Sequence, residues 1–182
     1  MLMLTLGVLL WSVAHLFKRL APSTREGMGD LGKLVVTVAL IGSVVMMISG
    51  YQGASGQVWW VRQPLWTSIS NLLMLLAFYL MVASSMKVAI TSKVRHPQLT
   101  AIKAWSVSHL LVKGDLPSII LFGGLLAWAV VSVILINRQD GKDALAAADT
   151  SWVKEAIASA VTVGLYGAVA HAHAYLGHPV NG

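Results

Sequence analysis

The chain has 182 residues, of which 57% are hydrophobic and 11% are charged, and its mean hydropathy is +0.73. Soluble domains carry about 25% charged residues, so the composition excludes a soluble protein and predicts a multi-pass membrane protein with one domain over residues 1–182. The net charge of +6 comes from basic residues spread over short polar segments, which is typical of membrane topology signals and not of nucleic-acid binding. Because the chain has no cysteine, disulfides and thiolate metal sites are excluded.

Five apolar segments follow one another along the chain. Each approaches the ~20 residues that a helix needs to cross the ~30 Å hydrocarbon layer. They cover approximately residues 2–17, 34–51, 65–89, 116–136 and 153–176. We therefore predict an all-α fold, a polytopic transmembrane helix bundle.

A sixth segment, residues 99–112, is shorter and contains His109. Pro97 suits the first position of this helix because proline has no N–H to leave unsatisfied there, and Asp115 is placed to cap the helix that follows. The segment is either a short re-entrant helix added to five spans or a sixth span. The basic residues of the loops are compatible with both arrangements and fit six spans slightly better.

Two histidines lie inside apolar segments, where an unsatisfied imidazole is costly. His15 precedes Lys18 by one turn, and His109 follows Trp105 by one turn. A histidine at the membrane boundary can bind water or headgroups, and one on an apolar helix face can be a satisfied packing residue. Paired imidazoles on facing helices can instead hold haem b between them without cysteine or carboxylate ligands.

Three further histidines are weaker candidates. Arg95 and His96 stand before Pro97, where they either anchor a loop at the headgroups or clamp a carboxylate or phosphate, such as a haem propionate or a lipid head. His171 and His173 are two residues apart, so on a helix they point in nearly opposite directions. At most one of them can face the bundle, and His173 is the better candidate.

These motifs have a known counterpart, because the chain resembles the NnrU family of small integral membrane proteins, which includes the plastid 15-cis-zeta-carotene isomerase. The resemblance runs nearly end to end, and its most specific part is the block from Arg95 to Asp115 with its interval from His96 to His109. The tail departs from the family's closing His-Pro-x-Leu pattern because Ala174 replaces the proline. The matching motifs are WSVAHLFKRLAP from residue 11, RHPQ from 95, WSVSHLL from 105, KGD from 113 and LFGG from 121.

The resemblance implies a haem b protein of the cell inner membrane. It implies that His15 and His109 are the axial iron ligands. Arg95 and His96, from their side-chain chemistry, and Trp105, from the helix face that it shares with His109, are further candidate cofactor contacts. The bacterial branch of the family is associated with nitrite and nitric oxide metabolism, which implies a redox or nitric-oxide-linked role with membrane lipids and respiratory or nitrogen-oxide reductase components as partners. The alternatives are a haem-dependent isomerase of a carotenoid-like substrate and a non-haem membrane scaffold.

The two predicted ligands restrict the topology. Their nitrogens must lie about 4 Å apart, each about 2 Å from the iron. If residues 99–112 cross the membrane, His15 and His109 differ in depth by roughly 10 Å. We therefore expect five spans plus one short re-entrant helix, which would bring His109 back to the level of His15, in preference to six spans.

Overall fold

The computed structural model describes residues 1–141, 151–177 and 180, and in this part of the chain it is built of helices without a β-sheet. Five helical stretches are long and apolar enough to cross a membrane, which confirms the predicted all-α bundle and makes the chain a multi-pass membrane protein. They are α1 (Leu2–Leu20), α3 (Gly29–Gln52), α4 (Pro64–Met86), the continuous stretch Leu116–Gln139 and α8 (Trp152–Tyr175).

Shorter elements connect these helices. The stretch Leu116–Gln139 consists of a first turn, α6 (Leu116–Ser118), a π-helical turn, η2 (Ile119–Gly123), and α7 (Gly124–Gln139). The remaining elements are α2 (Pro22–Gly27), the 3₁₀ turn η1 (Ala89–Ser92) and α5 (Pro97–Val112). The predicted starts are confirmed at two places: Pro97 is the first residue of α5, and the Asp115 carboxylate accepts a hydrogen bond from Ser118 N at 2.9 Å.

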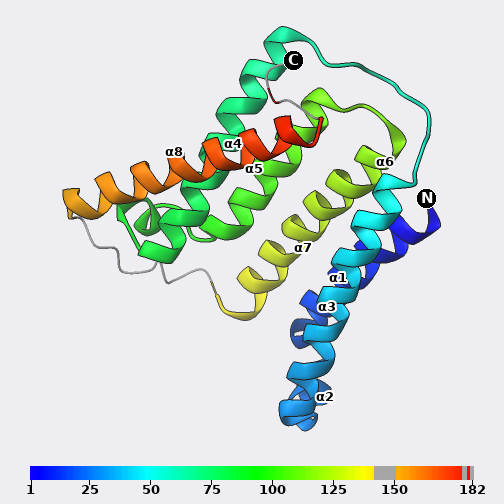
Figure 1. Cartoon of the computed structure of the whole chain (residues 1–182). Coiled ribbons are helices and arrows are strands. Elements are labelled where there is room, and N and C mark those ends of the chain that lie inside the picture. The colour runs from blue at the N-terminus through cyan, green and yellow to red at the C-terminus, as the bar shows by residue number, and fades with distance from the viewer. Residues whose placement is uncertain (142–150, 178–179, 181–182) are drawn as a thin grey trace.

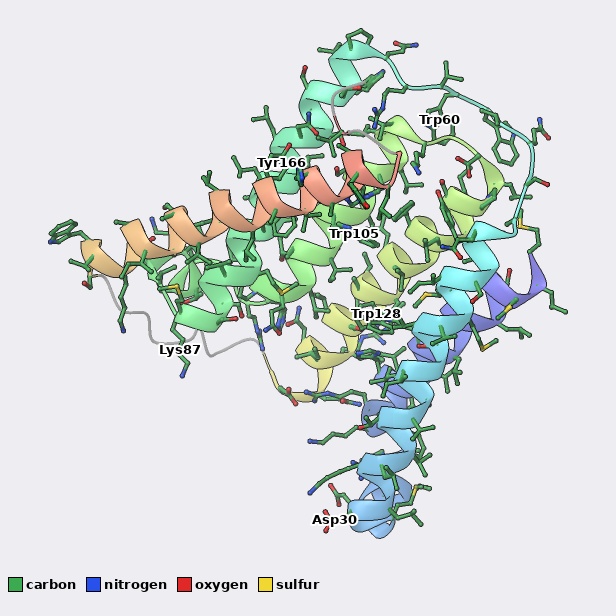
Figure 2. The ribbon with its side chains drawn as sticks, in the orientation of Figure 1. Asp30, Trp60, Lys87, Trp105, Trp128 and Tyr166 are labelled. Atoms are coloured by element: carbon green, nitrogen blue, oxygen red, sulfur yellow. The ribbon has the colours of Figure 1, made fainter. Side chains whose placement is uncertain are left out.

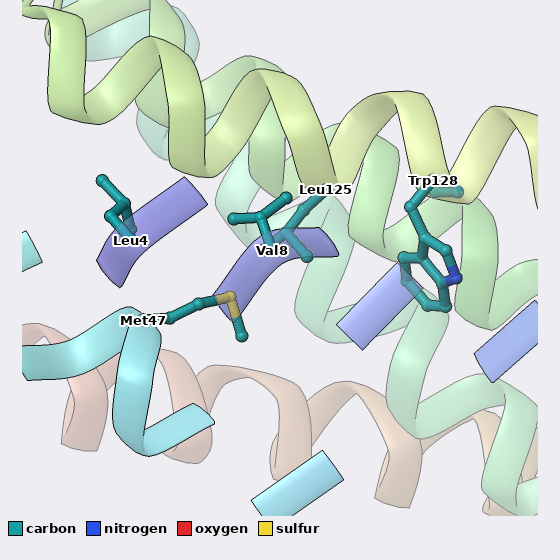
Figure 3. Close-up of a cluster of buried hydrophobic side chains, with 6 residues drawn as sticks. Leu4, Val8, Met47, Leu125 and Trp128 are labelled. Carbon is teal, nitrogen blue, oxygen red and sulfur yellow. The ribbon is translucent and has the colours of Figure 1, made fainter. Parts of the chain in front are cut away.

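The helices pack as a row in the order α3, α1, α7, α5, α4, α8 (Figure 1). The most extensive contacts join α1 to α3 and α4 to α5, and α7 connects these two pairs. A core cluster at the first junction contains Leu4 and Val8 of α1, Met47 of α3, and Leu125 and Trp128 of α7 (Figure 3). The row therefore has two arms joined through α7.

The two ends of the bundle are distinct surfaces. We call the end where α1, α4 and α7 finish the Asp140 face, since Arg19 at the end of α1 pairs there with Asp140 at 2.6 Å. We call the opposite end the Lys113 face, where the Lys113 ammonium donates to the Tyr51 hydroxyl at 3.3 Å.

Helix α5 runs from one face to the other. At its start on the Asp140 face, His96 Nε2 lies 2.9 Å from Asn137 Oδ1, and near its end on the Lys113 face Trp60 Nε1 donates to the Leu110 carbonyl at 2.8 Å. The structure thus has the five predicted stretches long enough to cross a membrane and a shorter α5 of 16 residues that also runs from one face to the other. The reason is the turn after it: Gly114 packs directly against Trp60, and the next helix starts on the Lys113 face.

Candidate functional site

His15 lies half-buried on α1 among tryptophans. Its ring centroid is 4.1 Å from Trp11 and 4.8 Å from Trp128, and Nδ1 lies 3.1 Å from the Trp11 carbonyl oxygen. With the proton on Nδ1 this is an N–H donating to a carbonyl, so Nε2 is the nitrogen left to bind a metal. Trp128 is labelled in Figure 2 on the inner side of α7, which faces α1.

The same cluster contains polar atoms without partners. The indole nitrogens of Trp11 and Trp128 are buried and make no hydrogen bond within the described part of the chain. A buried donor without an acceptor costs on the order of 1–3 kcal/mol. The rings instead contact one another edge to face, with centroids 5.6 Å apart.

His109 lies on α5 in a second aromatic cluster. Its ring stacks on Phe122 with centroids 4.3 Å apart, and Trp105 is 5.0 Å away. Nδ1 lies 2.9 Å from the Trp105 carbonyl oxygen, which repeats the arrangement of His15 and Trp11. Here too Nε2 is the nitrogen available to a ligand.

His109 lines a cavity of about 280 Å³ between α4, α5 and α8. His173 of α8 lines the same cavity. His173 Nδ1 lies 2.9 Å from the Val169 carbonyl oxygen, whereas His171 is exposed, as the helical spacing predicts. Tyr166 of α8, which is labelled in Figure 2, also lines this cavity.

The wall of this cavity includes charged and hydroxyl groups that the sequence patterns did not single out. Lys113 and Arg62 stand at the Lys113 face, and the buried hydroxyls of Ser70 and Ser108 are hydrogen-bonded to each other at 2.8 Å. Small hydroxyl residues within the apolar segments were the available signal, because such residues commonly join helices in lipid.

The structure places His15 and His109 in separate clusters. Their contacts on the shared stretch Leu116–Gln139 are Trp128 and Phe122, six residues or roughly 9 Å apart along a helix. His109 lines the cavity of about 280 Å³ between α4, α5 and α8, and His15 does not line it. The depth difference expected for a crossing α5 is therefore present, and the histidine that shares a cavity with His109 is His173.

Arg95 and His96 lie at the other end of α5 from His109. The Arg95 guanidinium donates to the Gly141 carbonyl, and His96 Nε2 pairs with Asn137. Thirteen residues of helix separate His96 from His109, which corresponds to roughly 20 Å. The predicted cofactor contacts are thus divided between the two faces, with Trp105 between them.

A polar network adjoins the His109 cluster at the Lys113 face. The Tyr51 hydroxyl accepts from Lys113 and is bonded to Ser118 Oγ at 2.8 Å, and Ser118 Oγ donates to the Asp115 carboxylate at 3.0 Å. Asp115 therefore both caps its helix and ends this network. Tyr51 and Ser118 join this network only because α3 lies beside α6. The spacing of residues in the sequence does not predict that the two helices are neighbours.

Within the described residues, no three histidine, aspartate or glutamate side chains are grouped to hold a metal ion by themselves. A haem requires fewer protein ligands, because the porphyrin supplies four nitrogens and the protein one or two. His109 and His173 line one cavity, and each has Nδ1 at hydrogen-bond distance from a backbone carbonyl, so both Nε2 atoms remain as candidate ligands.

The profile of the NnrU protein family matches residues 3–180, nearly the whole chain. The chain belongs to the NnrU family. No curated protein and no solved structure matches it. The matched range includes every histidine described above.

Proposed function

We propose that this NnrU-family protein binds haem b in the cavity between α4, α5 and α8, with His109 and His173 as its axial ligands. The observation that carries the proposal is that imidazoles from two different helices line one cavity, each with Nδ1 at hydrogen-bond distance from a backbone carbonyl. Such a hydrogen bond fixes the tautomer and the ring orientation and leaves Nε2 for a metal.

The remaining groups of the cavity suit the two propionates of haem b. Lys113 and Arg62 offer cationic donors to carboxylates, and both stand at the face of the bundle where water is accessible. Phe78 and Tyr166 supply aromatic surface further along the cavity. The cavity therefore combines nitrogen ligands, apolar walls and cations at one end.

Haem b supplies reversible one-electron chemistry, and two imidazole ligands suit it to electron transfer or redox sensing. We assign this centre a redox or nitric-oxide-linked role in nitrogen-oxide metabolism, with the protein in the cell inner membrane. The Trp105 carbonyl orients the His109 ring through Nδ1, and Phe122 stacks on this ring.

The test is haem content, measured as pyridine haemochrome per mass of protein purified from cells supplied with haem. We expect His109→Ala and His173→Ala each to lower haem content or abolish the bis-imidazole spectrum. His171→Ala is the matched control, since this exposed histidine lies two residues from His173 on the same helix. Haem content and spectrum that remain unchanged in both cavity variants would refute the assignment.

His15→Ala separates the two possible ligand pairs. If His173 is the second ligand, this variant keeps the spectrum, because His15 lies in the Trp11 and Trp128 cluster and outside the cavity. Loss of the spectrum in His15→Ala with retention in His173→Ala would instead support the pair implied by the family resemblance. Protein that contains no haem at all supports a non-haem scaffold.

A second candidate function is the isomerisation of a lipophilic, carotenoid-like substrate. It is favoured by an apolar cavity of about 350 Å³ between the two arms of the row. Three tryptophans line it, Trp11, Trp105 and Trp128, together with three methionines. Product analysis with poly-cis carotenes in a carotenoid-producing host tests this candidate, and absence of turnover argues against it.

Protein partners follow from the same proposal. A redox centre in the inner membrane would exchange electrons with respiratory or nitrogen-oxide reductase components. Co-purification from membranes in mild detergent should recover such a component in stoichiometric amount, and it should do so from the haem-loaded protein.

A further inference from the structure

A separate cavity of about 330 Å³ opens at the Asp140 face, at the opposite end of α5 from the proposed haem site. It lies between the end of α4, the turn η1 and the start of α5. Lys87 and Arg95 line it, and none of the described residues that line it is acidic. The cavity is therefore suited to an anion.

Two carboxylates of the described residues, Asp140 and Glu155, lie near this cavity and are engaged elsewhere. Asp140 is close enough to Arg95 for their charges to interact, but its two oxygens accept from Arg19 at 2.6 and 2.8 Å. Glu155 accepts from Ala89 N at 2.7 Å and from the Tyr79 hydroxyl. Neither carboxylate lines the cavity, so neither occupies the position between the two cations.

The first turn of α5 adds neutral donors to the same cavity. His96 is the N-cap residue but makes no side-chain cap, unlike Asp115 at the start of α6. Pro97 has no N–H, so the first free donors of the helix are the N–H groups of Gln98 and Leu99, two residues that line the cavity. An uncapped helix start favours a bound phosphate or carboxylate through these donors and the helix dipole.

The surroundings of the cavity indicate which anion it takes. Ile136 and Leu99 form an apolar part of its wall, and Ile136 lies one turn before the end of the stretch Leu116–Gln139. Ser84 lies equally near the end of α4. A cavity with cations on its polar side and aliphatic side chains on the other, at the end of two spans, matches a lipid at the membrane interface.

We propose that this cavity binds the phosphate headgroup of an anionic phospholipid, with Lys87 and Arg95 as charged contacts and the first N–H groups of α5 as neutral ones. Its acyl chains extend along Ile136 and Leu99. This lipid site is independent of haem, because α5 separates the two cavities by most of its length.

The experiment measures lipid binding to the full chain in neutral detergent by native mass spectrometry, with phosphatidylglycerol and phosphatidylcholine as probes. We expect preferential binding of phosphatidylglycerol. Each charge-assisted hydrogen bond to the phosphate contributes roughly tenfold, so the double variant Lys87→Gln/Arg95→Gln should bind phosphatidylglycerol roughly a hundredfold more weakly. The control Lys18→Gln/Lys93→Gln removes the same charge from exposed positions at the same face and should bind nearly as the parent protein does.

Three results would overturn the proposal. Equal losses in the two double variants would show diffuse attraction without a site. Unchanged binding in the cavity variant would exclude these contacts. Inorganic phosphate that displaces phosphatidylglycerol would identify a soluble phosphate as the occupant. If the double variant fails to fold, Lys87→Gln alone still tests the proposal, since Lys87 is an exposed residue whose loss should weaken binding roughly tenfold.

Discussion

Replacing Gly50 with alanine tests how closely α1 and α3 pack. A Cβ atom at Gly50 would lie 2.5 Å from Leu4 N and 2.8 Å from Leu4 Cα, and both of these are backbone atoms that cannot rotate away. To reach ordinary contact the two helices must separate by about 1 Å, and overpacking of this kind costs about 1–3 kcal/mol. Leu4 is fully buried in the core cluster, so this separation also opens its contacts with Val8 and Met47.

The change also alters helix propensity, which a second variant isolates. Alanine in place of glycine in a helix gains about 1 kcal/mol. Gly42 lies on the same helix, and a Cβ there would meet no atom within 4 Å. Gly42→Ala should therefore stabilise the protein slightly, while Gly50→Ala should be less stable than Gly42→Ala by about 1–3 kcal/mol.

The assay is reversible unfolding in mixed micelles with increasing denaturing detergent, followed by the helical circular dichroism signal. The free energy of unfolding of each variant is compared with that of the parent chain under identical conditions. If the two alanine variants unfold at the same midpoint, the close contact between α1 and α3 is not a constraint on stability and the reasoning from backbone distance fails.

Two further predictions concern polar pairs. Ser108→Ala removes a hydroxyl that bonds Ser70 Oγ at 2.8 Å, and it should lower the free energy of unfolding by on the order of 1 kcal/mol. Removing both hydroxyls should cost no more, because no buried donor is then left unpaired. Thermal unfolding of the single and double variants measures this, and a larger loss in the double variant would contradict it. The hydrogen bonds from Arg19 hold the pKa of Asp140 below its ordinary value, so this pair stabilises the fold above the ordinary carboxyl pKa, near pH 4, and loses its contribution as the pH falls through the lowered pKa. Asp140→Asn should therefore be less stable than the parent chain at neutral pH and converge with it in acid, and a constant difference across this range would refute the assignment.

Local features were predictable because they depend on neighbouring residues. The five spans agree with the predicted segments to within a few residues, since the hydropathy of about twenty consecutive residues decides whether a helix enters lipid. The start of α5 at Pro97 and the cap by Asp115 follow from one missing donor and one carboxylate. The helical repeat was enough to predict that at most one of His171 and His173 faces the bundle.

The pairing of the histidines depended on how the helices meet. His15 and His109 are each part of a similar Trp-x-x-x-His pattern, yet one packs against Trp128 and the other against Phe122 and the cavity with His173. No sequence spacing relates α1, α5 and α8, because their contacts arise only when the row of helices assembles.

The sequence by itself therefore determined that this protein crosses a membrane, where its helices begin and end, and which side chains are chemically capable of binding iron or phosphate. Tertiary structure alone decided that α5 traverses the bundle, that Arg95 and His109 lie at opposite faces, and that His109 shares a cavity with His173. The physical reason is that the transfer of any apolar helix surface into lipid is about equally favourable. Hydrophobicity therefore specifies insertion, whereas close packing of small residues such as Gly50 and a few polar contacts select which helices become neighbours.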